Sequence, residues 1–279
     1  MSVNSRLSPD WLAALSIIKT QADSLGIPFM VIGASARDIL LNLWSISPTR
    51  ATRDVDLAIE IASWGRFEEL RNALVATGSF QSNNQLQRLT FEGHLPIDLV
   101  PYGAIERSNS EISWPPDHAV LMSVAGMKDA FDSSLTLPLS ESPNPLEIHV
   151  ASAAGIALLK LIAWEDRKLS TTKDAEDLYF LLRHYIDLGN QNHLQSDHED
   201  LFEDFDSAHA RLLGRDLLEI CSSETLLAVK SILDRETASS NESILVRDML
   251  PRRAESDQIS LCRKWLTAMW AEMFEMDTF

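Results

Sequence analysis

The stretch RATRDVDLAIE (Arg50–Glu60) places two aspartates, Asp54 and Asp56, one residue apart in a run that otherwise alternates with Val, Leu and Ile. Residues two apart in a β-strand point to the same side, so both aspartates share one face and the apolar residues share the other. Two neighbouring carboxylates repel each other and raise each other's pKa unless a positive charge lies between them. The stretch therefore predicts a strand with one buried face, whose polar face is a candidate site for a divalent metal ion.

The segments around this strand alternate between strand and helix patterns. The apolar run IPFMVIG ends in glycine, which is typical of a buried strand. Ser8, Pro9 and Gly26 have the residue types of a helix cap, a first-turn residue and a helix stop. In chain order we expect a helix over 8–26, a strand over 27–33, a helix over 34–44, the aspartate strand, a helix over 64–78, and strands over 86–93 and 95–103. This order predicts an α+β fold, with a small mixed sheet covered by helices.

The second half of the chain has a different pattern. Consecutive prolines in SWPPD (113–117) predict a rigid loop, because they do not fit a regular element. The runs SSLTLPL (133–139) and LEIHV (146–150) predict two strands around the turn SESPNP. From Ser152 onward nearly every segment has helical periodicity. We therefore expect a core domain over 1–150 and a helical domain over 151–279.

A strand that ends in glycine and leads directly into a helix is a candidate phosphate site. In VIGASARD, Gly33 would let the backbone approach a ligand closely and Ser35 could donate its hydroxyl. The start of a helix offers unpaired N–H groups and the positive end of a dipole, which suit a phosphate. Taken alone, such a junction is more often an ordinary turn.

A third aspartate has the same pattern as the first two. In LPIDLVPYG, Asp98 alternates with Ile97 and Leu99 and so faces away from them. If this strand neighbours the aspartate strand, three carboxylates converge on one patch. Three carboxylates together with a triphosphate form the oxygen-rich environment that Mg²⁺ prefers. The alternative is a set of solvated acids at the edge of a sheet.

The helical half contributes a further group of charged residues. Lys160 and Arg167 are seven residues apart and lie on one helix face, and apolar residues surround Lys160. Downstream, Asp174 and Asp177 share a face at a spacing of three. An ordinary salt-bridge pattern among these residues is the alternative to a functional role, and for Asp177 it is the favoured interpretation.

Composition limits the class of protein. The formal net charge of −17 argues against broad, unspecific nucleic-acid binding, which depends on Lys and Arg neutralising phosphates. It leaves room for a local basic pocket. The chain shows no membrane-spanning apolar run and no export signal at its start. Cys221 and Cys262 match no metal or redox spacing, and the seven histidines show no ligand spacing, so we expect a cytoplasmic protein without a zinc site.

An ordered set of motifs resembles a known family. IGASARDILL, RATRDVDLAIE, IDLVPYG, WPPD, LLKLIAWEDR and KDAEDLYFLL together resemble the AbiEii/AbiGii type of toxin nucleotidyltransferase, a branch of the DNA polymerase β-like superfamily. The resemblance implies a polymerase β-like core, namely a small mixed sheet with helices. It also implies a mostly helical C-terminal region that completes the active site.

The resemblance also implies roles for particular residues. It implies that Mg²⁺ or Mn²⁺ is held by Asp54, Asp56 and Asp98. The phosphates of an NTP would lie at the helix start, and a helical lysine and a downstream aspartate would assist. The nucleotide-binding residues expected on this basis are Gly33, Ala34, Ser35, Arg37 and Lys160, and the catalytic residues are Asp54, Asp56, Asp98, Lys160 and Asp174. Two departures concern Ala34, which lacks a hydroxyl, and a long gap before Asp54 that implies an extra loop around SISPTR (45–50).

The expected activity is transfer of NMP from an NTP to an acceptor hydroxyl, on an RNA such as tRNA or on a protein. The resemblance further implies a toxin of a toxin–antitoxin or abortive-infection system, with a cognate antitoxin as a partner. Three alternatives stay open at this point. They are a non-catalytic nucleotide-binding or antitoxin-partner module, a small-molecule nucleotidyltransferase, and a helical scaffold whose acids are coincidental.

Overall fold

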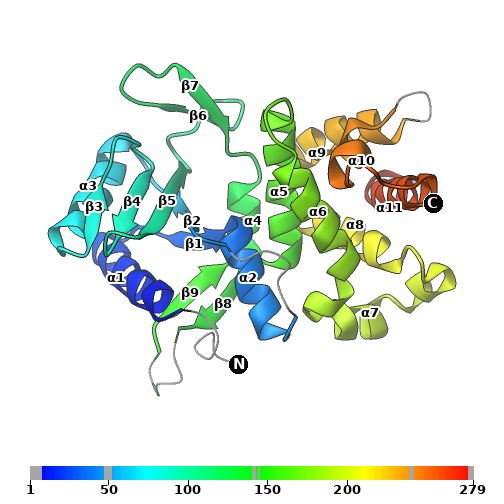
Figure 1. Ribbon diagram of the computed structural model, residues 1–279, viewed down its shortest axis with the longest axis horizontal. Coiled ribbons are helices and arrows are strands. Elements are labelled where there is room, and N and C mark those ends of the chain that lie inside the picture. Colours follow the sequence, from blue (N-terminus) through cyan, green and yellow to red (C-terminus); the bar gives the residue numbers. More distant parts are fainter. Residues whose placement is uncertain (1–7, 47–51, 140–142, 144, 239–241, 276–279) are drawn as a thin grey trace. The chain divides into compact units, whose positions relative to one another are not determined.

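The structure, a computed structural model, describes residues 8–46, 52–139, 143, 145–238 and 242–275. The chain divides into two compact units, Met1–Ser152 and Ala153–Phe279. The first is built around a β-sheet and the second is helical, as the ribbon in Figure 1 shows. The α+β class predicted from the alternating patterns is confirmed.

The first unit contains a seven-stranded mixed sheet with the strand order β3-β4-β5-β2-β1-β9-β8. β2 lies parallel to β5 and antiparallel to β1, and β1 is parallel to β9. Its strands are β1 (Phe29–Ile32), β2 (Val55–Glu60), β3 (Phe80–Ser82), β4 (Arg88–Phe91), β5 (Leu95–Tyr102), β8 (Leu135–Pro138) and β9 (Glu147–Val150). β2 therefore lies inside the sheet with a neighbour on each side. The side chains of Val55, Leu57 and Ile59 are fully buried, which confirms the predicted apolar face.

The three helices predicted for this unit are present, and their ends agree with the predicted ones to within two residues. α1 (Pro9–Leu25) is capped by the Ser8 hydroxyl, which accepts a hydrogen bond from the Trp11 N–H. It stops at Gly26, whose φ of 63° is in the left-handed region. α2 (Gly33–Leu43) follows β1 directly and packs on β1 and β2. α3 (Trp64–Ala76) is capped by Ser63 and packs against α1.

Four elements of this unit were not predicted. They are the short strand β3, the helix α4 (Met127–Asp132), and the separate hairpin of β6 (Glu111–Trp114) and β7 (Val120–Ser123). The predicted loop over 113–117 is wrong at its start, because Ser113 and Trp114 belong to β6. The prolines after them form the hairpin turn. The strands β8 and β9 pair antiparallel as expected, whereas the turn between them lies largely outside the described residues.

The second unit is helical throughout the part of it that the structure describes. Its helices are α5 (Ala153–Arg167), α6 (Lys173–His184), the kinked turn η2 (Ile186–Asn190), α7 (Gln191–Asp197), the 3₁₀ segment η3 (Glu199–Asp204), α8 (Ala208–Ile220), α9 (Ser223–Thr237), α10 (Ile244–Met249) and α11 (Ser256–Phe274). Apolar faces hold them together, with α8 packed on α11 and α5 packed on α6. Across the described residues, no helix is both long and apolar enough to cross a bilayer.

Candidate active site

The three predicted aspartates meet on neighbouring strands of the sheet. In the β2–β5 ladder, Asp56 is the direct partner of Asp98. Directly opposed residues in a ladder project from the same face of the sheet, so these two carboxylates lie side by side. Asp54 comes just before β2, two residues from Asp56. One carboxylate oxygen from each of the three lies within 4.8 Å of the other two. We call Asp54, Asp56 and Asp98 the aspartate cluster.

Gly33 brings the start of α2 against this cluster. Its φ is 63°, a conformation that side chains disfavour, and a Cβ at this position would lie 2.7 Å from Oδ2 of Asp56. In the β1–β2 ladder, Ile32 is the direct partner of Asp56. The register therefore fixes the junction between β1 and α2 beside the cluster. Glycine is required here both by the backbone conformation and by the close approach of the carboxylate.

Ser35 has a structural connection that the sequence did not reveal. Its side chain is completely buried, and its hydroxyl donates to the Ile32 carbonyl at 2.8 Å. The same oxygen accepts a hydrogen bond from the Asp56 N–H at 3.1 Å. Ser35 therefore ties α2 to β2, and its hydroxyl proton is used within the chain. The backbone N–H groups at the start of α2 are the groups that suit a phosphate.

Arg37 and Asp38 connect α2 to the segment before the aspartate strand. The Arg37 side chain is buried, and its Nη2 donates to Oδ1 of Asp38 at 2.9 Å. Oδ2 of Asp38 accepts from the Thr52 N–H at 3.1 Å. This contact anchors the chain two residues before Asp54. Most of the predicted extra loop around SISPTR (45–50) lies outside the described residues.

Arg88 on β4 contacts the aspartate cluster, and the sequence analysis did not predict this contact. In the β4–β5 ladder it is the direct partner of Asp98. Its Nε donates to Oδ1 of Asp98 at 2.7 Å, and its Nη2 donates to Oδ2. The same Nη2 lies 3.8 Å from Oδ2 of Asp54. The hydrogen bonds from Arg88 to Asp98, and the nearby carboxylates, raise the pKa of the Arg88 guanidinium.

The charged residues predicted in the helical half form a cluster of their own. Nζ of Lys160 lies 3.1 Å from Oδ1 of Asp174 and 2.7 Å from Oδ2 of Asp177. Arg167 donates to Asp174 through Nε at 2.6 Å and Nη2 at 2.8 Å. We call these four residues the helical ion-pair cluster. Its contacts match the salt-bridge alternative, and they join α5 to α6.

Burial and ion pairing act in opposite directions on Asp174. Burial alone would raise the pKa of its carboxyl. The hydrogen bonds from Arg167 and the charge of Lys160 outweigh burial and lower this pKa. The Asp174 carboxylate is therefore held ionised inside the helical unit, where its side chain is only 1% exposed.

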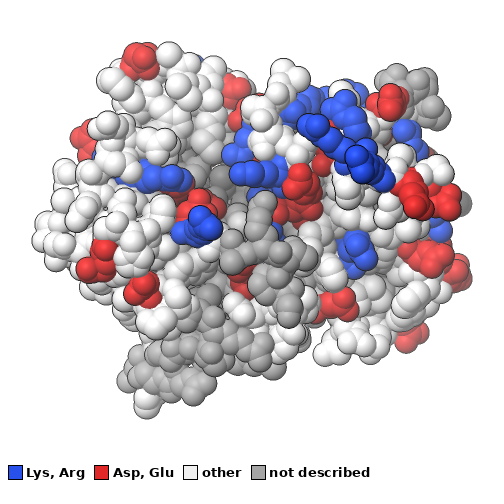
Figure 2. All heavy atoms as spheres, in the orientation of Figure 1, with Lys and Arg blue, Asp and Glu red and all other residues white. Residues whose placement is uncertain are grey.

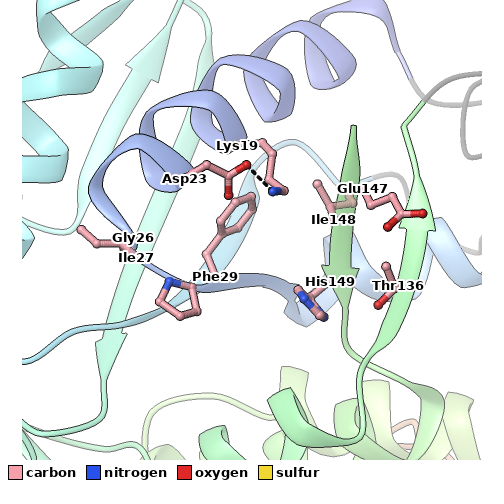
Figure 3. Close-up of a pocket in the computed structure, with 10 residues that line it drawn as sticks. Lys19, Asp23, Gly26, Ile27, Phe29, Thr136, Glu147, Ile148 and His149 are labelled. Atoms are coloured by element: carbon pink, nitrogen blue, oxygen red, sulfur yellow. Dashed lines mark hydrogen bonds and ion pairs between the residues drawn. The ribbon is translucent and has the colours of Figure 1, made fainter. Parts of the chain in front are cut away.

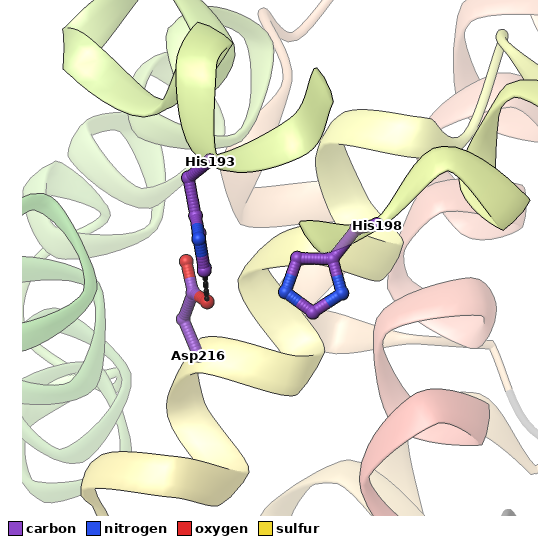
Figure 4. A group of neighbouring side chains, drawn as sticks. All are labelled: His193, His198 and Asp216. Atoms are coloured by element: carbon purple, nitrogen blue, oxygen red, sulfur yellow. Dashed lines mark hydrogen bonds and ion pairs between the residues drawn. The ribbon is translucent and has the colours of Figure 1, made fainter. Parts of the chain in front are cut away.

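His193, His198 and Asp216 also form a group (Figure 4), in which one possible ligand atom of each residue lies within 4.8 Å of the others, although the spacing of the histidines in the sequence gave no such signal. His193 is hydrogen-bonded to carboxylates through both ring nitrogens, to Asp197 and to Asp216, each at 3.1 Å. Burial lowers the pKa of His193, but these two hydrogen bonds outweigh burial and raise it. Arg215 donates to Nδ1 of His198 at 3.0 Å. These contacts describe an ion-pair network between α7 and α8, and a guanidinium at this position disfavours a bound cation.

A cavity of about 430 Å³ lies at the other end of β1 from the aspartate cluster (Figure 3). Its wall includes Phe29, the first residue of β1, and His149 on β9. Lys19 and Asp23 of α1 form an ion pair at its edge. None of the aspartates of the cluster lines this cavity, so it is separate from the candidate site.

The aspartate cluster has the chemistry of a divalent-cation site. It presents three carboxylates, which are the hard oxygen ligands that Mg²⁺ and Mn²⁺ accept. Gly33 keeps the adjoining space free of a side chain. The amides at the start of α2 suit an anion beside the cation. Together, these groups match the needs of a metal-bound phosphate ester.

Comparison with known proteins places the chain in a family. Residues 21–276 match the family described as "Nucleotidyl transferase AbiEii toxin, Type IV TA system". No curated protein sequence matches the chain significantly.

Solved structures show distant likeness. The antibiotic-resistance factor ANT(2'')-Ia has 14% sequence identity and a TM-score of 0.39, over 71% of this chain and 97% of that chain. A CCA-adding enzyme in complex with ATP has 14% identity and a TM-score of 0.32, over 92% of this chain and 67% of that one. The CD-NTase CdnG of Bradyrhizobium diazoefficiens in complex with GTP has 14% identity and a TM-score of 0.31, over 99% and 90%.

The family match covers both units and includes every residue of the aspartate cluster. It agrees with the resemblance that the ordered motifs predicted. The chain belongs to the AbiEii family of nucleotidyltransferase toxins of type IV toxin–antitoxin systems.

Proposed function

We propose that this protein transfers the NMP moiety of an NTP to an acceptor hydroxyl, with Mg²⁺ or Mn²⁺ bound by the aspartate cluster. The observation that carries the proposal is the approach of three carboxylates to within 4.8 Å on adjacent strands, next to the start of α2. Carboxylates this close repel each other and raise each other's pKa, and a cation between them relieves both effects. Family membership supplies the reaction class.

Each part of the site has a defined task in this proposal. Asp54, Asp56 and Asp98 hold the metal ion. When bound, a divalent ion stabilises the negative charge that builds up on phosphate oxygens during in-line displacement. The first amides of α2 orient the phosphates of the NTP, and Gly33 allows the close approach that this requires. Ser35 keeps α2 and β2 in register through its two hydrogen bonds.

We propose RNA as the acceptor, and exposed arginines beside a groove in the helical unit support this. The groove has a volume of about 680 Å³, and its lining includes three arginines, Arg247, Arg252 and Arg263, and three acidic residues, Glu176, Glu242 and Asp248. Figure 2 shows Lys and Arg side chains gathered near α10 on this face. Arg252 and Arg253 are exposed and form no ion pair with any residue that the structure describes. Exposed arginines of this kind suit the phosphates of RNA, despite the net charge of −17.

The helical unit is proposed to complete the active site through Lys160 and Asp174. This part of the proposal rests on the family resemblance. The contact between the two residues is also explained by their ion pair within the unit. Lys160→Arg keeps the positive charge, so the melting temperature (Tm) should change little. If Lys160 acts in the active site, the different shape of the arginine side chain should reduce transfer. Equal transfer rates for Lys160→Arg and the wild type would restrict Lys160 to its role in the helical ion-pair cluster.

The biological part of the proposal follows from the family. A type IV system implies a cognate antitoxin that counteracts this protein. The two free cysteines fit action in the cytoplasm, where NTPs and RNA are present. Expression with and without a neighbouring antitoxin gene, scored by growth, tests this part separately from the chemistry.

The enzymatic proposal is tested by label transfer. Purified protein is incubated with each α-labelled NTP, Mg²⁺ or Mn²⁺, and total RNA. We expect label on RNA for the wild type and for Asp132→Ala, which removes an exposed helical carboxylate of the same unit. Asp56→Ala should show no transfer. Label on the protein itself or on a small molecule would replace RNA as the acceptor, and metal-dependent NTP binding without turnover would favour a binding module.

A further inference from the structure

Arg88 supplies the aspartate cluster with a positive charge from within the chain. Its guanidinium makes a bidentate, side-on contact with Asp98, in which Nε and Nη2 each donate to a different carboxylate oxygen. Nη2 also lies 3.8 Å from Oδ2 of Asp54. The Arg88 side chain is 33% exposed. The cluster therefore carries an internal counter-ion at the side that faces β4.

The position of Arg88 is fixed by the sheet. Leu89, the next residue, is fully buried and is the direct partner of the buried Ile97. A strand that buries Leu89 must turn Arg88 to the opposite face, toward Asp98. The Leu99 N–H also donates to the Gln87 carbonyl at 2.8 Å, which holds β4 and β5 together beside the pair. The contact between Arg88 and Asp98 is thus part of the strand register.

The contact has a consequence for metal binding. A side-on guanidinium engages both oxygens of a carboxylate. A divalent ion at Asp98 needs lone pairs of these same oxygens, and the positive charge of Arg88 also repels that ion. Arg88 and a metal ion therefore compete for Asp98, and each must weaken the binding of the other.

We propose that Arg88 is a built-in competitor for the metal site. In the metal-free protein it balances Asp98 and, in part, Asp54. Each Asp98 oxygen that accepts from Arg88 has one lone pair fewer for a metal ion, and the charge of the guanidinium repels that ion. Arg88 is therefore a positioning residue that raises the metal concentration at which the aspartate cluster fills. This inference rests on the proposed metal site.

The test is the affinity of the full chain for Mn²⁺ without nucleotide, measured from the loss of the free-Mn²⁺ signal in electron paramagnetic resonance. Arg88→Gln should lower the dissociation constant about tenfold, the effect of losing one or two hydrogen bonds to a charged group. Arg88→Lys keeps the positive charge but not the pair of parallel N–H donors, and it should give an intermediate dissociation constant. Arg66→Gln, which removes a half-exposed guanidinium paired with Glu69 in the same unit, should leave the constant unchanged.

Two results would overturn the inference. An unchanged constant for Arg88→Gln would mean that Arg88 does not compete, and a raised constant would mean that it organises Asp98 for the metal. Adding Asp98→Asn to Arg88→Gln should abolish the gain. If Mn²⁺ binding is indifferent to Asp56→Asn as well, the proposed metal site fails. If binding needs Asp56 but ignores Arg88, only the present inference fails. Should Arg88→Gln not fold, Arg88→Lys alone decides the outcome.

Discussion

The two units each hold a cluster of carboxylates and cations, and the clusters differ in charge balance. In the sheet unit, the guanidinium of Arg88 lies beside two of the three carboxylates of the aspartate cluster, those of Asp98 and Asp54. In the helical unit, Asp174 and Asp177 face two cations, Lys160 and Arg167. The Asp54 side chain is 41% exposed, whereas that of Asp174 is 1% exposed.

The difference separates two uses of the same chemical groups. The helical ion-pair cluster is neutralised from within and joins two helices in a buried place, where an unpaired charge is very costly. The aspartate cluster gathers three carboxylates at a place that solvent reaches. Repulsion between neighbouring carboxylates costs stability and is reduced when a cation binds. We expect that removing a carboxylate from the helical ion-pair cluster mainly lowers stability, whereas removing one from the aspartate cluster mainly lowers activity.

The largest effect is expected from removing a charge in the aspartate cluster. Asp56→Asn should reduce the rate of nucleotidyl transfer about 10³-fold or more, because it removes a central metal ligand. The free energy of unfolding without metal should change by no more than about 1 kcal/mol, since repulsion with Asp98 is relieved. Transfer assays and urea denaturation measure the two effects. A folded variant that retains its transfer rate would break the comparison.

A substitution in the helical ion-pair cluster should act on stability. Asp174→Ala leaves Lys160 with one buried partner fewer and Arg167 without its bidentate acceptor. We expect a loss of about 3 kcal/mol in the free energy of unfolding. Chemical denaturation followed by circular dichroism checks this, with Asp234→Ala as the control because Asp234 pairs with Lys230 at the surface. A loss for Asp174→Ala no larger than for this control would contradict a buried structural role.

Acid should reduce the difference in the free energy of unfolding between the wild type and Asp174→Ala. The folded pKa of Asp174 is lowered, so the stability that its carboxylate contributes is present above the unfolded pKa and is lost as pH falls through the folded value. As pH falls from the unfolded pKa of this carboxyl through its lower folded pKa, the gap in the free energy of unfolding between the two proteins should shrink. Denaturation curves at several pH values measure this gap. A gap that widens with acid would contradict the assigned direction.

The smallest effect is the stabilisation by metal. Mn²⁺ at about ten times its dissociation constant should stabilise the protein by about 1.4 kcal/mol, which corresponds to a rise of about 2–4 °C in Tm. The rise should vanish in Asp56→Asn and persist in Asp177→Asn. Thermal scans of both variants, with MnCl₂ and with CaCl₂, measure the rise in Tm. An equal rise in both variants would place the bound ion elsewhere.

The sequence predicted those parts of the fold that local patterns encode. Ser8 and Gly26 marked the ends of α1, and the alternation around Asp56 marked β2. The hairpin of β6 and β7 was missed because its strands show little apolar alternation, and Val120 is itself 62% exposed. The strand β3 has three residues, which is too short for a periodic signal.

The candidate site was predictable to the extent that it lies on strand faces. The alternation of Asp98 with Ile97 and Leu99 was enough to predict its face, but its pairing with Asp56 depends on a register between distant strands. Arg88 was missed for the same reason, since a single arginine in a strand pattern carries no sign of its partner. The hydrogen bond from the Asp56 N–H to the buried Ser35 hydroxyl joins residues 21 apart in the sequence, so no local pattern could predict it.

The central claim is that Asp54, Asp56 and Asp98 share a divalent cation. Anomalous X-ray diffraction from crystals grown with MnCl₂ and a non-hydrolysable NTP tests it most directly. We expect a manganese peak within about 2.5 Å of a carboxylate oxygen of each aspartate. Fully ordered crystals with no peak at the cluster, or with manganese bound only elsewhere, would contradict it.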